Sequence, residues 1–183
     1  ADCSSAQKYI ESVTDEVMGV IKNGGTDSAK EAKLTGIFKR SIDSNWMGKF
    51  VLGRGWQSLS ADQQKTYLGK YSNYLIASYV PIFRKYSGEK IAVNSSKPLE
   101  KDGEFLVATS IERAGKQPVL VNYRVRKEAA CYKVVDFIPE GISLINTQRQ
   151  DFGAVLSRNG YDGLIASLDK KIAAAAVQAT AAK

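Results

Sequence analysis

The sequence predicts an α+β fold in which a four-stranded antiparallel, curved sheet packs against a set of helices on one face. Three observations predict it. Apolar residues recur at helical spacing over residues 4–88, alternate with polar residues over 89–135, and return to helical spacing from residue 143. The breaks inside the alternating region are short, which suits antiparallel neighbours better than parallel crossovers.

The N-terminal third of the chain predicts helices. Residues 4–25 carry one apolar face and end at a pair of glycines. Residues 27–53 fit one bent helix or two in succession, broken near residues 41–44, where short polar side chains compete for the backbone. A third helix begins at Ser60, which has Gln63 at capping-box spacing, and Pro81 should kink or divide it.

Four alternating segments then predict the strands of a meander. Each is bounded by a short run rich in turn residues. Their apolar positions are Ile91 and Val93; Phe105, Val107 and Ile111; Val119, Val121, Tyr123 and Val125; and Tyr132 and Val134.

The last third returns to helix. Ser143 is the predicted N-cap of a helix that stops at Gly160, and a short helix around residues 164–168 follows. Residues 173–183 are rich in alanine and predict a frayed tail. We therefore expect one domain over residues 1–172, a size at which about 70% of the unfolded surface can be buried.

The charge of the chain limits which classes of binding partner we expect. The chain has 26 Lys and Arg against 19 Asp and Glu, so its surface should attract nucleic acid, phospholipid head groups or an acidic protein. The positive charge is spread over segments such as 28–54 and 112–133 and is not gathered in one groove with aromatics, which argues against nucleic acid. No apolar window approaches the length of a transmembrane helix.

The chain starts without Met, as a mature exported protein does after its signal peptide is removed, so we expect export. Two cysteines, Cys3 and Cys131, can pair in an oxidising compartment, or Cys131 can be a buried thiol. The sequence leaves both open.

The residue types present argue against most kinds of catalytic, metal and cofactor site. The chain has no histidine, which removes the usual general base and the commonest metal ligand. No phosphate-loop motif occurs, and GRG at residues 53–55 lacks the strand that precedes a dinucleotide fingerprint. We therefore expect no cofactor, no metal and no enzymatic activity.

Two alternatives stay open at this point. A small cavity enzyme would use Asp136 and Glu140 as acid and base, although hydrogen-bonded corner residues are the more common role of such a pair. A protein-binding adaptor would have a filled core instead of a cavity.

The segment YKVVDFIPEGISLINTQRQDF, residues 132–152, resembles the MlaC, or toluene-tolerance, family of periplasmic phospholipid-binding proteins. GRGWQSLSADQQKTYLGKYSNYLIASY and PVLVNYRVRK resemble that family as well. The residues in matching places of the first segment are Asp136, Glu140, Gly141, Ile142, Ser143, Leu144, Arg149 and Phe152. Cys131 departs from the pattern, because a Trp is common there.

The resemblance implies a monomeric carrier in the periplasm. It would exchange phospholipid with the substrate-binding component of an inner-membrane ABC transporter and with an outer-membrane lipoprotein complex. The acyl chains would lie in an apolar pocket between sheet and helices. The abundance of apolar helix residues is consistent with such a pocket.

Twelve apolar residues are our candidates for the lipid-binding site, although each can equally be a plain core position. They are Phe50, Val51, Leu75, Tyr79, Ile82, Phe105, Val107, Val121, Tyr123, Val134, Ile145 and Phe152.

Overall fold

The computed structural model describes residues 1–84 and 89–181. Their contacts divide the chain into two compact units. The sheet unit comprises residues 1–43 and 83–144, and the helical unit comprises residues 44–82 and 145–183. The end of the predicted third helix at 85–88 and the last two residues of the predicted tail lie outside the described residues. The expected single domain over residues 1–172 stays a prediction.

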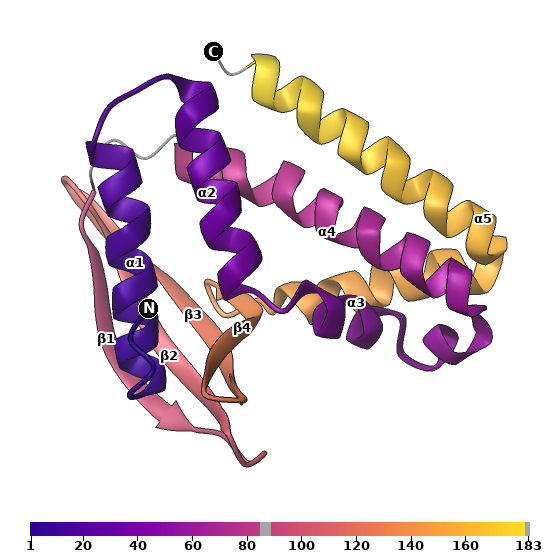
Figure 1. Cartoon of the computed structure of the whole chain (residues 1–183), viewed down its shortest axis with the longest axis horizontal. Helices are drawn as coiled ribbons and strands as arrows, with labels where there is room; N and C mark the ends of the chain where they lie inside the picture. The colour runs from indigo at the N-terminus through magenta and orange to yellow at the C-terminus, as the bar shows by residue number, and fades with distance from the viewer. Residues whose placement is uncertain (85–88, 182–183) are drawn as a thin grey trace. The chain divides into compact units, whose positions relative to one another are not determined.

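The sheet is the predicted four-stranded antiparallel meander, in the order β1-β2-β3-β4 (Figure 1). Its strands are β1 (Ile91–Pro98), β2 (Glu104–Arg113), β3 (Lys116–Glu128) and β4 (Cys131–Pro139). Register shifts interrupt all three pairings, including one near Arg124 in the pairing of β3 with β4. Such bulges bend the strands and increase their twist. The predicted α+β fold with an antiparallel sheet is confirmed.

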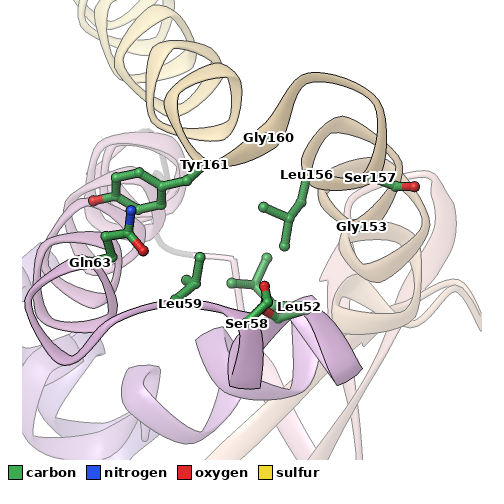
Figure 2. A pocket seen from close by; sticks show the side chains of 10 residues that line it. Leu52, Ser58, Leu59, Gln63, Gly153, Leu156, Ser157, Gly160 and Tyr161 are labelled. Carbon is green, nitrogen blue, oxygen red and sulfur yellow. The ribbon is translucent and has the colours of Figure 1, made fainter.

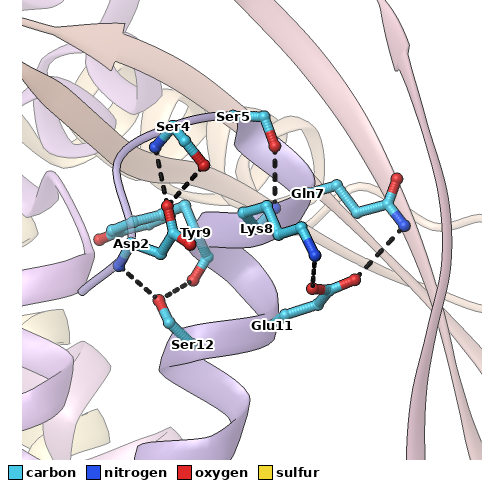
Figure 3. A network of polar contacts seen from close by, with 8 residues as sticks. All are labelled: Asp2, Ser4, Ser5, Gln7, Lys8, Tyr9, Glu11 and Ser12. Carbon is cyan, nitrogen blue, oxygen red and sulfur yellow. Dashed lines mark hydrogen bonds and ion pairs between the residues drawn. The ribbon is translucent and has the colours of Figure 1, made fainter.

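Two helices precede the sheet, α1 (Ala6–Lys22) and α2 (Asp27–Ser41). The Ser5 hydroxyl caps α1 by accepting from the backbone N–H of Lys8, and Ser4 donates to the carboxylate of Asp2 just before it (Figure 3). A side-chain oxygen at this position satisfies one of the backbone donors that a helix leaves unpaired at its start. The predicted N-terminal helix is therefore present.

α1 packs on one face of the sheet. Ala6, Tyr9 and Ile10 are almost fully buried and form one apolar cluster with residues of β2, β3 and β4. The sheet residues of this cluster are Val107, Val125, Tyr132 and Val134. This cluster is the core of the sheet unit.

A disulfide joins Cys3, which precedes α1, to Cys131 at the start of β4. The two residues are 128 positions apart in sequence. The bond attaches the segment just before α1 to β4, an edge strand of the sheet. Of the two possibilities that the sequence left open, the structure has the disulfide.

The helical unit contains α3 (Ser44–Leu52), the short 3-10 helix η1 (Gly53–Ser58), and most of α4 (Ala61–Arg84) and α5 (Leu144–Ala181). The last two residues of α4 and the first residue of α5 belong to the sheet unit. α2 ends at Ser41 and α3 begins at Ser44, so the break predicted near residues 41–44 is confirmed. The Ser60 hydroxyl accepts from the N–H of Gln63, and the Gln63 side chain accepts from the N–H of Ser60, as a capping box requires.

Two predicted helix interruptions have different outcomes. α4 continues through Pro81 to Arg84, so Pro81 does not divide it. Pro81 has no N–H to donate to the carbonyl of Ala77, four residues earlier, and the helix continues despite this missing hydrogen bond. In α5, Gly160 leaves the helical conformation with φ 70° and ψ −172°, as predicted, and a second helical segment follows it. This segment continues to Ala181, further than the predicted short helix, while fraying of the tail stays a prediction.

Candidate functional site

Five of the twelve candidate residues lie on one face of the sheet. Phe105 pairs with Val125, which pairs with Val134, and Val107 pairs with Tyr123. Directly paired residues share a face of the sheet, and so do residues two positions apart along a strand. The five residues brought together in this way are Phe105, Val107, Val121, Tyr123 and Val134.

α1 covers part of this face. Val107 and Val134 are buried against it, whereas Phe105 and Tyr123 are only partly buried at the side of the cluster. The Tyr123 ring meets Phe137 edge-on, with 5.4 Å between ring centroids. Phe105 and Tyr123 are therefore the two aromatic candidates of the sheet unit that keep exposed surface.

The other seven candidates belong to the helical unit. α3 carries Phe50 and Val51, α4 carries Leu75, Tyr79 and Ile82, and α5 carries Ile145 and Phe152. Val51, Leu75, Ile145 and Phe152 are almost fully buried, but Ile82 is 49% exposed. Burial raises the pKa of Tyr79 to about 12.

Polar atoms are buried in the middle of the helical unit. The Tyr67 hydroxyl donates to the backbone carbonyl of Gly48 at 2.8 Å. The Tyr71 hydroxyl donates to Oε1 of Gln148 at 2.6 Å. Sequence reasoning did not find Gln148. The available signal was an amide placed three residues after Ile145 and four before Phe152, on the apolar face of a helix.

Arg149 packs against an aromatic pair. Trp46 and Phe50 stack with 5.4 Å between their centroids, and the Arg149 guanidinium lies 4.9 Å from the centre of the Phe50 ring. A Cβ on Gly53 would come within 2.9 Å of the same guanidinium, so the glycine leaves room for it. The ring face attracts the cation by a cation–π interaction.

Surface cavities in the described part of the chain include two of similar volume. One, of about 450 Å³, lies in the helical unit where η1 faces α5. Leu52, Leu59 and Leu156 point into it, and Gln63 and Tyr161 lie at one side (Figure 2). The other, of about 430 Å³, lies between α1 and α2 and is lined by residues such as Glu16 and Arg40. None of the twelve candidates lines either cavity.

Asp136 and Glu140 have different environments. Asp136 is buried, and its two carboxylate oxygens accept hydrogen bonds from the Phe137 N–H and the Ser143 hydroxyl. Glu140 is exposed in the turn and has a positive φ of 49°. This geometry supports a structural role for Asp136 at the corner. It gives no support to an acid–base pair.

Within residues 1–84 and 89–181, no three His, Cys, Asp or Glu side chains are close enough to hold a metal ion. Of the helices described, none is both long and apolar enough to span a membrane.

Comparison with known proteins gives consistent matches. The model of the family described as "MlaC protein" matches residues 11–170. The intermembrane phospholipid transport system binding protein MlaC of Haemophilus influenzae is 25% identical over 132 residues, which are 70% of this chain and 62% of that protein. The chain therefore aligns with less than two thirds of this relative's length.

A solved structure also matches. It is that of a phospholipid-binding protein from Ralstonia solanacearum in complex with a phospholipid. The TM-score is 0.83 at 24% sequence identity, and the match covers 94% of this chain and 99% of the other. At this identity the match establishes a shared fold.

Proposed function

The chain belongs to the MlaC family, and from this premise we propose that it is a periplasmic phospholipid carrier that acts without covalent chemistry. The observation that carries the proposal is the family match over residues 11–170, which spans both compact units. The names of the relatives support it, since one belongs to an intermembrane phospholipid transport system and the other is bound to a phospholipid.

Such a carrier must keep the acyl chains of its lipid away from water. Each methylene group exposed to water costs about 0.8 kcal/mol, so a two-chain lipid needs an apolar enclosure to cross an aqueous space. The twelve candidate residues remain our proposal for the side chains that contact the acyl chains. Among them, Phe105 and Tyr123 supply partly exposed aromatic surface next to a buried core.

We also propose that the polar head group meets a basic surface. The helical unit holds nine Lys and Arg against four Asp and Glu, whereas the sheet unit holds 17 against 15. Most of the positive surplus of the chain is therefore in the helical unit. Phosphate groups are attracted to such a surface, and so are acidic faces of partner proteins.

The proposed partners follow from the same role. The carrier, as a monomer, would receive or deliver phospholipid at the substrate-binding component of an inner-membrane ABC transporter and at an outer-membrane lipoprotein complex. A pocket as apolar as the bilayer makes transfer nearly neutral in free energy, so the partners would set the direction.

An uptake experiment tests the proposal. Delipidated protein is incubated with vesicles of phosphatidylethanolamine and phosphatidylglycerol, separated by gel filtration, and assayed for phospholipid. We expect phospholipid to elute with the protein. Tyr123→Ser should reduce the uptake, whereas Leu120→Ser, at an exposed position of the same strand, should not. Absence of any uptake would contradict the carrier and favour an adaptor with a filled core.

A further inference from the structure

The side-chain amide of Gln148 is buried with only half of its hydrogen-bonding groups used. Gln148 lies on α5 and is 4% exposed. Its Oε1 accepts the hydrogen bond from the Tyr71 hydroxyl, but its Nε2 has no hydrogen-bond partner among the described residues. Buried polar groups in native proteins nearly always have a partner, so this N–H donor calls for an explanation.

The length of the hydrogen bond agrees with the way the amide points in the structure. The donor–acceptor distance from Tyr71 is 2.6 Å. This is typical of an O–H···O hydrogen bond, whereas an N–H···O bond is usually about 2.9 Å long. The oxygen of the amide therefore faces Tyr71, and the two N–H donors of Nε2 point elsewhere. Only an acceptor can satisfy them.

The surroundings of the amide indicate what kind of acceptor it meets. Ile145 precedes Gln148 by three residues and Phe152 follows it by four, so all three lie on one face of α5. Leu75 follows Tyr71 by four residues on α4, so these two also share a face. Ile145, Phe152 and Leu75 are all candidate contacts of the acyl chains. The unpaired donor thus shares a helix face with two apolar side chains proposed to hold lipid tails, and its partner Tyr71 shares a face with a third.

A phospholipid has acceptors at the position that this arrangement requires. Each acyl chain begins at an ester, whose carbonyl oxygen accepts hydrogen bonds and is attached directly to the apolar tail. We propose that Nε2 of Gln148 donates a hydrogen bond to an acyl-ester carbonyl of the bound phospholipid, while Tyr71 holds the amide in this orientation. Gln148 would then distinguish ester-linked from ether-linked lipids. This inference rests on the proposed carrier function and adds a specificity-determining residue to it.

The discrimination has a clear chemical origin. An ether-linked phospholipid has the same head group and chains but lacks the ester carbonyls. A site built to hydrogen-bond a group of its ligand rejects analogues that lack the group, because its own buried donor is left unpaired. A buried water could also accept from Nε2. In that case the protein would not distinguish the two lipids.

The test is a competition between the two lipids. Delipidated protein is loaded from vesicles that contain equal amounts of diester and diether phosphatidylglycerol with matched chains, and the bound lipids are quantified by mass spectrometry. We expect wild type to prefer the diester about tenfold, a ratio equivalent to about 1.4 kcal/mol. Gln148→Met, which replaces the amide by an apolar side chain of similar length, should load both lipids equally.

Two further variants control the result. Gln150→Met makes the same exchange at an exposed position of the same helix and should keep the preference of wild type. Tyr71→Phe removes the hydroxyl that holds the amide and should weaken the preference, which provides a second readout should Gln148→Met fold poorly. Thermal unfolding of each variant verifies that it is folded.

The outcomes separate the two proposals. Loading of wild type with diester and diether in equal amounts would overturn the role of Gln148 and leave the carrier function in place. The same holds if Gln148→Met keeps the preference of wild type. Failure of wild type to load either lipid would overturn both proposals.

Discussion

The hydroxyl of Ser143 donates a 2.5 Å hydrogen bond to the carboxylate of Asp136, seven residues earlier. The bond spans the turn in which β4 ends and α5 begins. The second oxygen of Asp136 accepts from the backbone N–H of Phe137. The turn itself contains two residues with positive φ, Glu140 and Gly141. A buried carboxylate thus holds together the turn that follows the last strand.

This bond should be important for stability. Ser143→Ala removes the hydroxyl and leaves one oxygen of a buried carboxylate with less hydrogen bonding, so we expect a loss of about 1.5–3 kcal/mol in the free energy of unfolding. Chemical denaturation measures it. Ser4→Ala removes a similar bond to Asp2 on the exposed N-terminal segment and should have a much smaller effect, because water replaces the lost bond. Equal effects of the two substitutions would contradict a structural role for the corner.

The disulfide should be a major source of stability. It closes a loop between residues 128 positions apart, and in the chain-entropy model a loop of about 100 residues or more contributes about 4–5 kcal/mol. We therefore expect Cys3→Ala with Cys131→Ala to lower the free energy of unfolding by several kcal/mol. Denaturation of wild type with and without a reductant provides the same comparison. An unchanged denaturation midpoint in both experiments would refute this expectation.

Gly48 and Gly69 should respond in opposite ways to substitution by alanine. A Cβ on Gly48 would lie 3.0 Å from the Leu68 side chain and 3.1 Å from the Tyr71 ring, so Gly48→Ala should destabilise the protein by about 1–3 kcal/mol. A Cβ on Gly69 would meet nothing within 4 Å. Because alanine favours helix, Gly69→Ala should stabilise α4 by about 0.5–1 kcal/mol. Melting temperatures that shift in the same direction would be inconsistent with this packing.

Glu128 should make stability depend on pH. It shares Arg126 with Asp43. Partial burial, and then the nearby Asp43 carboxyl, raise the pKa of Glu128 above its ordinary value of 4.5, although Arg126 opposes this. A raised carboxyl pKa gives stability that is fully present below the unfolded pKa and is lost as the pH rises through the folded pKa.

Glu128→Gln keeps the neutral form at every pH. The melting temperature of this variant relative to wild type should therefore increase between about pH 4 and about pH 7. Glu100→Gln, at an exposed position, should show no such trend. A difference between Glu128→Gln and wild type that does not change with pH would rule out this assignment.

Much of the fold could be predicted from local patterns. The strand alternation, the capping box at Ser60 and the helix stop at Gly160 are each determined by residues close in sequence, and all three are present. Pro81 shows the limit of such patterns. A proline removes one helical hydrogen bond, but whether the helix ends there depends on packing by residues distant in sequence, and α4 continues through Pro81.

The placement of the candidate residues was predictable only in part. Alternation along β2 and β3 places Val107, Val121 and Tyr123 on one face, as expected. Periodicity does not reveal which part of that face another helix covers, and α1 buries Val107 and Val134. Gln148 was missed for a similar reason. Its position on an apolar helix face is visible in the sequence, but the hydrogen bond from Tyr71, 77 residues away, depends on how α4 and α5 pack.

The central claim is that this protein carries phospholipid. The most direct test is native mass spectrometry of the protein purified gently, without detergent, from the periplasm of a Gram-negative bacterium, followed by extraction and identification of what it carries. We predict a population whose mass exceeds that of the chain by that of bound phospholipid, and recovery of diacyl phospholipid on extraction. A chain that carries no lipid in repeated preparations, and that cannot be loaded from vesicles, would contradict the account.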